Sequence, residues 1–296
     1  MTTLAGGAAI GAGCLDGGSS TNTANGANTV AGWSNGTIEF GLPPFQDQEE
    51  LDRQYEGLLA WLDDGFDDVA VEGTLTTSYS SVIESVVNGH TELANLSPLI
   101  YVMAADEGVT PLAVNELHGE PSYNAYVSTK ADSDIETLAD LEGKTVAMVD
   151  PLSTSGGLFP MHMLTEAGLD VGDVETDASD LDIEWSFGHD IAVGALADGH
   201  VDAAAYADFE HPADDEEIVV VEESAPIPLA AAVTMPETPD DVVSELRDRL
   251  LETPESALDE HIVSGFAEYD PDDYDLVREV AETFGVSVSD LDEAEG

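Results

Sequence analysis

Short apolar runs alternate with amphipathic helical patterns along this chain, and the alternation comes in two separate blocks. Each apolar run has the length of a buried strand, and the stretches between them carry apolar residues at helical spacing. Strands that alternate with helices pack side by side in parallel, so each block predicts its own mostly parallel sheet flanked by helices. The runs expected to be strands are 37–43, 69–73, 92–96, 123–128, 145–149, 182–186 and 201–206.

The chain leaves the first block, builds the second and then returns to the first. The segments 218–222 and 229–234 are expected to be strands on the way back. This order predicts an α/β fold of two lobes joined by a two-strand hinge. Its expected parts are an N-terminal segment at 1–36, lobe 1 at 37–125 plus 220–296, and lobe 2 at 126–219.

Acidic residues outnumber basic ones by 63 to 6, which gives a formal net charge of −57. Such a chain repels the phosphate backbone of nucleic acids, so no nucleic acid is expected as a partner. Extreme charge is typical of disorder, but 43% hydrophobic residues with clear periodicity indicate a folded protein. At about 1 M ionic strength the screening length is roughly 3 Å, which removes most of the repulsion. We therefore expect a protein from an extreme halophile that loses stability in dilute buffer.

Cys14 is the only cysteine, so no disulfide can form within the chain. It follows a run of small and apolar residues at 4–13 that is too short to span a bilayer. This run, the Ala12-Gly13-Cys14 box and the Gly/Ser/Thr/Asn-rich stretch after it are typical of a lipoprotein signal remnant and a flexible tether. The basic segment of such a signal is missing, so we expect the true start to lie upstream. The alternative is a disordered N-terminus with a chance cysteine.

A turn rich in hydroxyls and glycine joins the strand 145–149 to the helix expected at 158–167. Ser153, Thr154 and Ser155 supply hydroxyl donors, and two glycines after them let a ligand approach the backbone. The first N–H groups of a helix have no partners within the helix. The turn therefore predicts either an anion cradle or an ordinary serine N-cap.

Two further turns, at Tyr79-Ser80 and at Ser97, also bear hydroxyls and open helices. The carboxyl ends of parallel strands meet at one edge of a sheet, so we expect these turns to face the same cleft as the turn of lobe 2. None of the three turns carries a cation. A buried oxyanion in this cleft would be held by neutral donors.

Four segments resemble the substrate-binding proteins of ABC importers for phosphonate, phosphite and phosphate. The turn 150–160 is similar to that family's Asp-Pro-x-Ser-Thr-Ser-Gly-x-x-x-Pro motif. The segment 188–202 resembles its Gly-His-[Asp/Glu] helix followed by Gly-x-Val-Asp. The segment 92–98 resembles its Asp-[Ile/Leu]-Ala-x-x-Gly-Pro turn, with Leu96 at the aromatic position, and 223–228 resembles its return strand.

This resemblance implies the type II periplasmic-binding-protein fold. It also implies a protein that binds a solute but catalyses no reaction and holds no cofactor or metal. Tyr79 opens a helix where the family places a ligand-contacting tyrosine. The resemblance therefore further implies that phosphoryl oxygens contact Tyr79, the hydroxyl turn and His189, with Asp190 beside them. With the residues of the hydroxyl-bearing turns, the expected ligand-binding set is Tyr79, Ser80, Ser97, Ser153, Thr154, Ser155, His189, Asp190 and Tyr206.

The resemblance also implies a cellular role. We expect an exported monomer, lipid-anchored through Cys14 to the outer face of the cytoplasmic membrane. Its lobes would close over a phosphoryl oxyanion and deliver it to the permease and ATPase subunits of an importer.

Other functions fit the sequence less well or stay open. A hydrolase triad of Ser155, His189 and Asp190 is disfavoured because adjacent residues at a helix start point in diverging directions. No His-x-x-x-His pair or cysteine partner indicates a dedicated zinc site, and of seven histidines only His189 has a site argument. A binding protein for a sulfonate, nitrate or a thiamine precursor, and a ligand-sensing receptor of the same fold, stay open as alternatives.

Overall fold

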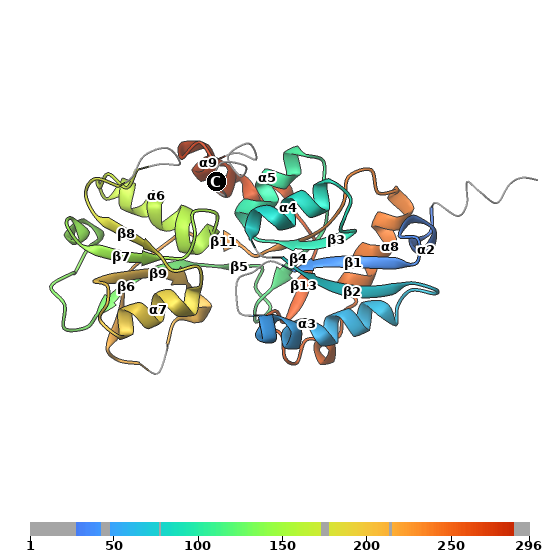
Figure 1. The fold of residues 1–296 in the computed structure, drawn as a ribbon, viewed down its shortest axis with the longest axis horizontal. Coiled ribbons are helices and arrows are strands. Elements are labelled where there is room, and N and C mark those ends of the chain that lie inside the picture. Colours follow the sequence, from blue (N-terminus) through green and yellow to red (C-terminus); the bar gives the residue numbers. More distant parts are fainter. Residues whose placement is uncertain (1–27, 43–47, 77, 173–177, 213–214, 287–296) are drawn as a thin grey trace, which may run out of the picture.

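The computed structural model describes residues 28–42, 48–76, 78–172, 178–212 and 215–286. Figure 1 shows two lobes lying end to end along the long axis, each built around a sheet. Cys14 and the predicted signal remnant and tether at 1–27 lie outside the described residues. Within the described part of the chain, no helix combines the length and the apolar character needed to cross a bilayer.

Lobe 1 contains a six-stranded sheet in the order β13-β4-β12-β3-β1-β2. The pairs of β1 with β2 and with β3 are parallel, whereas the pairs that involve β12 and β13 are antiparallel. This sheet is therefore mixed rather than mostly parallel, because the returning strand β12 inserts between two earlier strands. The strands are β1 (Thr37–Leu42), β2 (Ala70–Leu75), β3 (Leu93–Leu96), β4 (Thr110–Glu116), β12 (Ala231–Thr234) and β13 (Gly265–Ala267).

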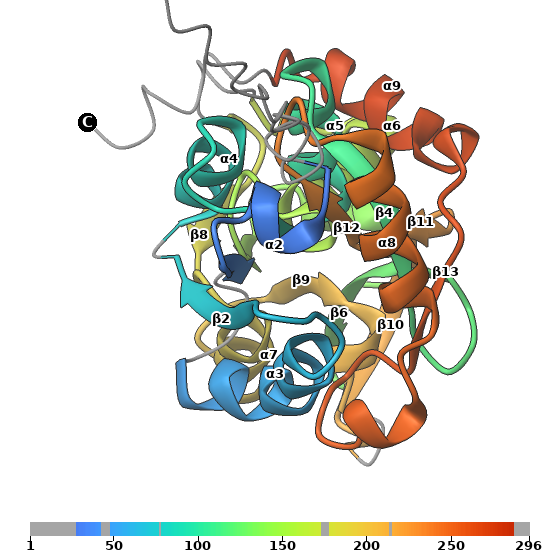
Figure 2. The ribbon, with the colours of Figure 1, turned by 90° about the vertical axis from the view of Figure 1, so that its right-hand side faces the viewer.

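Helices cover both faces of this sheet (Figure 2). The α3 and α8 helices pack on the face that buries Phe40, and α4, α5 and α9 pack on the face that buries Leu96. Period-two burial along the strands thus divides lobe 1 into two apolar layers. The helices are α2 (Val30–Trp33), α3 (Gln48–Asp63), α4 (Tyr79–Val87), α5 (Pro98–Asp106), α8 (Asp240–Leu251) and α9 (Asp275–Thr283).

Lobe 2 contains a five-stranded sheet in the order β10-β6-β9-β7-β8, with α6 (Phe159–Glu166) and α7 (His189–Ala197) on opposite faces. The pairs of β7 with β8 and β9 are parallel, and those of β6 with β9 and β10 are antiparallel. This sheet is also mixed. Its strands are β6 (Ala125–Lys130), β7 (Thr145–Met148), β8 (Asp182–Trp185), β9 (Ala203–Ala207) and β10 (Ile218–Glu223).

The chain passes between the lobes through two short antiparallel strands, β5 (Ser122–Tyr123) and β11 (Ile227–Pro228). The strand β10 pairs with β6 along its length, from Ile218 opposite Lys130 to Glu223 opposite Tyr126. The boundary expected at 219/220 therefore cuts through a strand of lobe 2, and the boundary expected after Ala125 includes the first residue of β6. The sequence pattern of β10 is equally compatible with a strand that returns to lobe 1, and only its pairing with β6 assigns it to lobe 2.

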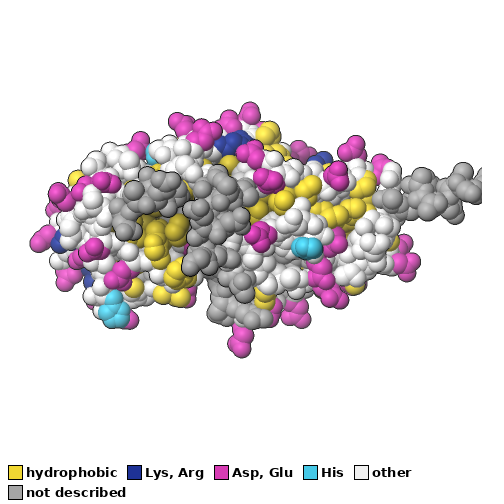
Figure 3. All heavy atoms as spheres, turned by 45° about the horizontal axis from the view of Figure 1, so that its top comes forward, with side chains coloured by type: hydrophobic (Ala, Val, Ile, Leu, Met, Phe, Trp, Pro, Cys, Tyr) yellow, Lys and Arg dark blue, Asp and Glu magenta, His cyan; other side chains and the backbone are white. Residues whose placement is uncertain are grey.

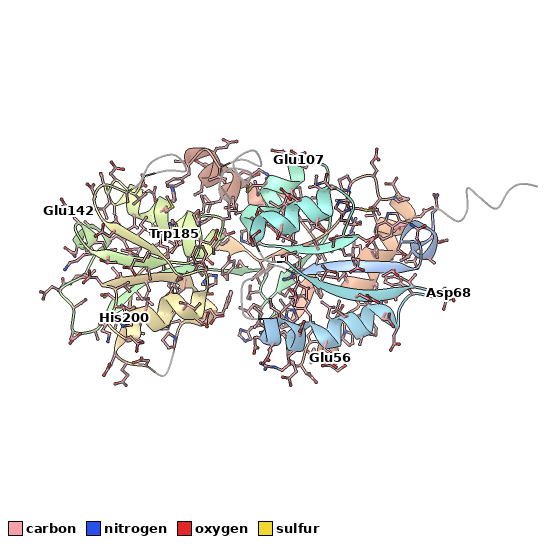
Figure 4. The ribbon with its side chains drawn as sticks, viewed as in Figure 1. Glu56, Asp68, Glu107, Glu142, Trp185 and His200 are labelled. Carbon is pink, nitrogen blue, oxygen red and sulfur yellow. The ribbon has the colours of Figure 1, made fainter. Side chains whose placement is uncertain are left out.

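The carboxylates lie on the outside of both lobes. Figure 3 shows Asp and Glu side chains spread over one face of the molecule, with few basic ones among them. Glu56, Asp68, Glu107 and Glu142 project from the periphery in Figure 4 and are exposed. With 63 acidic residues against 6 basic ones, most carboxylates have no cation available to neutralise them. The interior of the molecule, in contrast, is apolar and conventionally packed.

Candidate ligand-binding cavity between the lobes

A cavity of about 90 Å³ lies where the two lobes and the hinge meet. A water-sized group needs about 10–15 Å³ on this measure, so the cavity has room for several such groups. Lobe 2 contributes the hydroxyl turn, and lobe 1 contributes the ends of β3 and β4 together with a loop before β13. The lining residues are Tyr55, Asn95, Ser97, Pro98, Asn115, Leu117, Tyr123, Ser153, Thr154, Ser155, His189, Phe209, Leu229, Ala230, His261, Ile262 and Val263.

The lobe 2 wall is a tight turn after β7 that continues into a π-helical turn, η2 (Thr154–Leu158), and then α6. The Oγ of Ser153 accepts a 3.1 Å hydrogen bond from the N–H of Gly156, which caps the turn. A β-carbon on Gly157 would lie 2.1 Å from the carbonyl oxygen of Asp150, and one on Gly156 would lie 2.2 Å from Val149. The two glycines are therefore required by close approach within the turn.

Two contacts tie this turn to the rest of the cavity. The backbone N–H of Leu99, in the first turn of α5, donates a 2.9 Å hydrogen bond to Thr154 Oγ1 across the lobes. The side chain of Ser155 hydrogen-bonds that of Tyr123 in the hinge strand β5, and burial raises the pKa of Tyr123 well above its usual range. Thr154 accepts through its oxygen, so its own hydrogen is available to a ligand.

His189 enters the cavity from the start of α7. Its Nδ1 accepts a 3.1 Å hydrogen bond from the backbone N–H of Ala207, so the proton of the neutral ring sits on Nε2. Burial lowers the pKa of His189 to about 4. At neutral pH the ring is therefore an uncharged donor, and no acidic side chain is needed to orient it.

The lobe 1 wall carries polar atoms without partners. The hydroxyl of Ser97 is buried between β3 and α5, and it has no hydrogen-bond partner. The Oδ1 atoms of Asn95 and Asn115 are likewise buried and unpartnered. Buried polar atoms are nearly always paired in native proteins. Three such atoms on one cavity therefore indicate a surface built to hydrogen-bond a ligand.

A histidine from the loop before β13 completes this wall. His261 packs edge-on against Tyr55, with the ring centroids 4.4 Å apart. Its Nδ1 accepts a 2.9 Å bond from the N–H of Val263, whereas Nε2 is buried without a partner. Burial lowers the pKa of His261 to about 4. Like His189, it presents a neutral N–H donor.

The cavity has no formal charge of its own. Among the described residues that line it, none is Asp, Glu, Lys or Arg. The chain as a whole carries a net charge of −57, so the described lining of the cavity differs from the acidic surface in having no charged side chain. Hydroxyl and imidazole groups, together with the amino end of α5, supply neutral hydrogen-bond donors to this cavity.

The structure brings together five of the residues predicted for the site. Ser97, Ser153, Thr154, Ser155 and His189 line one cavity. Whether they contact a ligand stays a prediction.

Four other predicted residues have different positions. Ser80 lies buried in α4, outside the described lining, and its Oγ is 2.8 Å from that of Ser78. Tyr79 is the first residue of α4, and its side chain lies outside what the structure describes.

Asp190 is exposed and absent from the described lining, because successive helical residues point about 100° apart and His189 takes the inward direction. Tyr206 is fully buried on the α7 face of lobe 2, where its hydroxyl donates to Ser128 Oγ at 2.7 Å. The structure therefore does not place Asp190 or Tyr206 in the cavity, and whether either residue contacts a ligand stays a prediction.

Sequence reasoning missed much of the lobe 1 wall. Leu96, which stands at the aromatic position of the resembled turn, is fully buried in the core, and its neighbour Asn95 lines the cavity instead. His261, expected on the surface or in a packing gap, also lines it, as do Tyr55 and Asn115. For Tyr55, Asn95 and Asn115 the available signal was a polar group within an apolar helix or strand pattern, whereas His261 lies in a loop and gave no such signal.

Two chemical alternatives find no support in the described residues. No group of three or more His, Cys, Asp or Glu side chains there could hold a metal ion. The chain does contain one Gly-x-Ser-x-Gly match, at 32–36. That match begins within the helix α2 and ends just before the strand β1, so it joins a helix to a strand, whereas the nucleophile elbow of a hydrolase joins a strand to a helix.

Comparison with known proteins gives one family. Residues 40–274 match the family described as ABC transporter, phosphonate, periplasmic substrate-binding protein. The phosphate-import protein PhnD of Mycolicibacterium smegmatis is 34% identical over 173 residues, which cover 56% of this chain and 54% of that protein. This chain thus spans about half the length of that curated relative.

Two solved structures share the fold. PhnD1 from Prochlorococcus marinus, in complex with methylphosphonate, superposes with a TM-score of 0.73 at 16% identity, covering 84% of this chain and 98% of that chain. A binding protein component of an ABC phosphonate transporter from Pseudomonas aeruginosa gives 0.71 at 20% identity, covering 84% and 86%. These structures confirm the two-lobed fold.

Proposed function

Because this chain belongs to the phosphonate periplasmic substrate-binding proteins of ABC transporters, we propose that it captures a phosphoryl oxyanion between its lobes and delivers it to a permease. The observation that carries the proposal is the neutral cavity. Hydroxyls of lobe 2 and the N–H of His189 face the unpartnered hydroxyl of Ser97 from lobe 1. The ligand is a phosphonate, phosphite or phosphate, and no covalent chemistry takes place.

The oxyanion is held by hydrogen bonds instead of counter-charges. Ser153, Thr154 and Ser155 offer hydroxyl donors, and His189 offers Nε2–H because its Nδ1 is occupied by the amide of Ala207. Hydrogen bonds to a charged group contribute roughly 1.5–3 kcal/mol each, so a few of them suffice for tight binding. A cation is not required, and its absence from the described lining leaves the ligand free to leave when the lobes open.

Lobe closure is the proposed mechanism of capture and release. The ligand would bridge donors of both lobes, and a molecule that binds the closed form better shifts the population toward it. The bond between Leu99 and Thr154 supports this idea, since it already joins the lobes at the edge of the cavity. The two short hinge strands β5 and β11 would absorb the change in angle.

The proposed setting is the outer face of the cytoplasmic membrane in a strongly saline environment. The protein would be exported and held by a lipid on Cys14, acting as a monomer that docks to a permease and its ATPase. The phosphate-import relative and the family description support the import role. The net charge of −57 supports the saline environment.

The test is the double substitution Thr154→Ala and Ser155→Ala, titrated calorimetrically with phosphate, phosphite and methylphosphonate in molar salt. Losing two charge-assisted bonds should weaken binding by about 3–6 kcal/mol. The matched control is Thr165→Ala on α6, an exposed threonine whose hydroxyl bonds the carbonyl of Met161. Unchanged affinity in the double variant would remove the turn from the site.

A further inference from the structure

The lobe 1 wall contains polar atoms that an oxyanion cannot use. The Oδ1 atoms of Asn95 and Asn115 are hydrogen-bond acceptors, and they would repel the oxygens of an anion. Both asparagine side chains are more than nine-tenths buried, and both Oδ1 atoms lack partners. Each of these residues also lines the cavity. These acceptors therefore face a hydrogen-bond donor on some other part of the ligand.

The two asparagines lie on one face of the lobe 1 sheet. Asn95 on β3 is opposite Ala232 on β12, and Ala232 is opposite Ala113 on β4. Asn115 follows Ala113 by two residues, so its side chain points to the same side. That side is the one covered by α3, because Tyr55 of α3 packs with Ala113 and Ala232.

Two further neutral groups lie on this side of the cavity, the hydroxyl of Tyr55 and the imidazole of His261. Asn95 keeps its amide in place by donating from Nδ2 to the hydroxyl of Tyr55 at 2.9 Å. His261 packs edge-on against Tyr55, and its Nε2 has no hydrogen-bond partner. With Nδ1 accepting from Val263, Nε2 carries the proton and donates. This subsite, made of Asn95, Asn115 and His261, thus pairs acceptors with a donor.

A single chemical group fits this arrangement best. A hydroxyl can donate its one hydrogen to one of the two Oδ1 atoms, accept a hydrogen bond from His261 Nε2, and carry no charge into a buried site. An ammonium would lose its hydration without a carboxylate to replace it, since no described lining residue is acidic. A carboxylate would meet two amide oxygens, and an alkyl group would leave the buried polar atoms unpaired.

We propose that the subsite of Asn95, Asn115 and His261 selects phosphonates whose carbon substituent ends in a hydroxyl, and rejects their aminoalkyl and plain alkyl counterparts. The inference rests on the proposed function, because it takes the phosphoryl end to lie at the turn of Ser153 to Ser155. It adds the chemical class of the substituent, which binding at that turn leaves open.

The experiment compares ligands of matched size in molar salt by calorimetry: 2-hydroxyethylphosphonate, n-propylphosphonate, ethylphosphonate and 2-aminoethylphosphonate. The hydroxyl compound should bind at least about tenfold more tightly than either alkyl compound, because these leave buried partners unpaired. It should bind about a hundredfold more tightly than the aminoethyl compound, whose ammonium is desolvated without a counter-charge.

The variant Asn115→Leu removes one acceptor at similar volume, and Asn88→Leu at the exposed end of α4 is its control. The ratio of the ethyl to the hydroxyethyl dissociation constant should fall toward 1 in Asn115→Leu, whereas Asn88→Leu should keep the wild-type ratio. The ligand comparison on the unmodified protein decides the question even if Asn115→Leu does not fold.

The outcomes separate this inference from the proposed function. If the protein binds an alkyl or the aminoethyl phosphonate as tightly as the hydroxyethyl compound, or more tightly, the inference is overturned and phosphoryl capture still stands. A wild-type hydroxyl preference that persists in Asn115→Leu would remove Asn115 from the subsite. Failure of phosphate, phosphite and every phosphonate to bind would overturn the proposed function, and the inference with it.

Discussion

The backbone N–H of Leu99 in lobe 1 donates a 2.9 Å hydrogen bond to Thr154 Oγ1 in lobe 2. Leu99 lies in the first turn of α5, where backbone N–H groups have no partners within the helix. Thr154 begins the hydroxyl turn on the opposite wall of the cavity. One hydroxyl thus satisfies a donor of lobe 1 through its oxygen and offers its own hydrogen to a ligand. We therefore expect ligand binding and lobe contact to depend on the same side chain.

Replacing this hydroxyl by a methyl group tests that dependence. Thr154→Val keeps the shape of the side chain but leaves the Leu99 N–H buried without an acceptor, which costs about 1–3 kcal/mol. We expect a lower melting temperature and a weaker affinity for phosphate or methylphosphonate. Thr165→Val on α6 is the matched control, since Thr165 is exposed. Equal affinities for the two variants would show that the hydroxyl of Thr154 is dispensable.

Glycine replacement tests the close packing of the turn. A β-carbon on Gly157 would lie 2.1 Å from the carbonyl oxygen of Asp150, which is backbone and cannot move aside cheaply. Gly157→Ala should therefore distort the turn, with a loss of ligand affinity and a lower unfolding temperature. Gly194→Ala in the middle of α7 meets nothing within 4 Å and should be neutral or stabilising by up to about 1 kcal/mol. Thermal unfolding measures the stability of the two variants, and calorimetric titration measures their ligand affinity. A Gly157→Ala protein with wild-type stability and affinity would contradict the account.

Acid should destabilise the protein through its buried histidines. Burial lowers the pKa of His189 from 6.5 to about 4, so between these values the unfolded chain binds more protons than the folded one. Stability is then fully present above pH 6.5 and falls as the pH drops toward 4, by up to about 3 kcal/mol for one histidine. The free energy of unfolding, measured by denaturant titration at several pH values, should therefore fall less steeply in His189→Gln. A variant with the wild-type slope over this range would be inconsistent with a neutral buried His189.

The two-lobed fold and the lobe 2 wall of the cavity follow from local sequence. The turn from Ser153 to Ser155 sits between a short apolar run and a helix, so its place at the end of a parallel strand is fixed by neighbours in the chain. His189 is similar, because it opens a helix directly after β8. The alternation of strands and helices could be predicted for the same reason, whereas the pairing of β10 with β6 and the insertion of β12 between β3 and β4 depend on residues far apart in the chain.

The lobe 1 wall depends on contacts that no local pattern contains. Tyr55, Asn115 and His261 come from a helix, a strand and a loop that lie far apart in the chain and meet only in the folded lobe. That Asn95 lines the cavity, whereas Leu96 at the motif position points into the core, has a simpler cause. Successive strand residues point to opposite faces, so an error of one position reverses the assignment to core or cavity.

Salt should stabilise the fold strongly. The 63 carboxylates repel one another in dilute buffer, and molar salt shortens the screening length to roughly 3 Å. We expect the melting temperature, followed by circular dichroism, to rise by about 10 °C or more between dilute buffer and molar potassium chloride. For a chain of this size that rise corresponds to roughly 3–5 kcal/mol. A melting temperature that is independent of salt would argue against adaptation to a saline environment.

The central claim is that the neutral cavity between the lobes captures a phosphoryl oxyanion. Calorimetric titration of the unmodified protein in molar salt with phosphate, phosphite and methylphosphonate tests it most directly, with sulfate and nitrate as competitors of similar charge. The account predicts saturable binding of one equivalent of at least one phosphoryl compound, and much weaker binding of sulfate and nitrate. Saturable binding of sulfate or nitrate without any phosphoryl compound, or no binding of any of them, would contradict it.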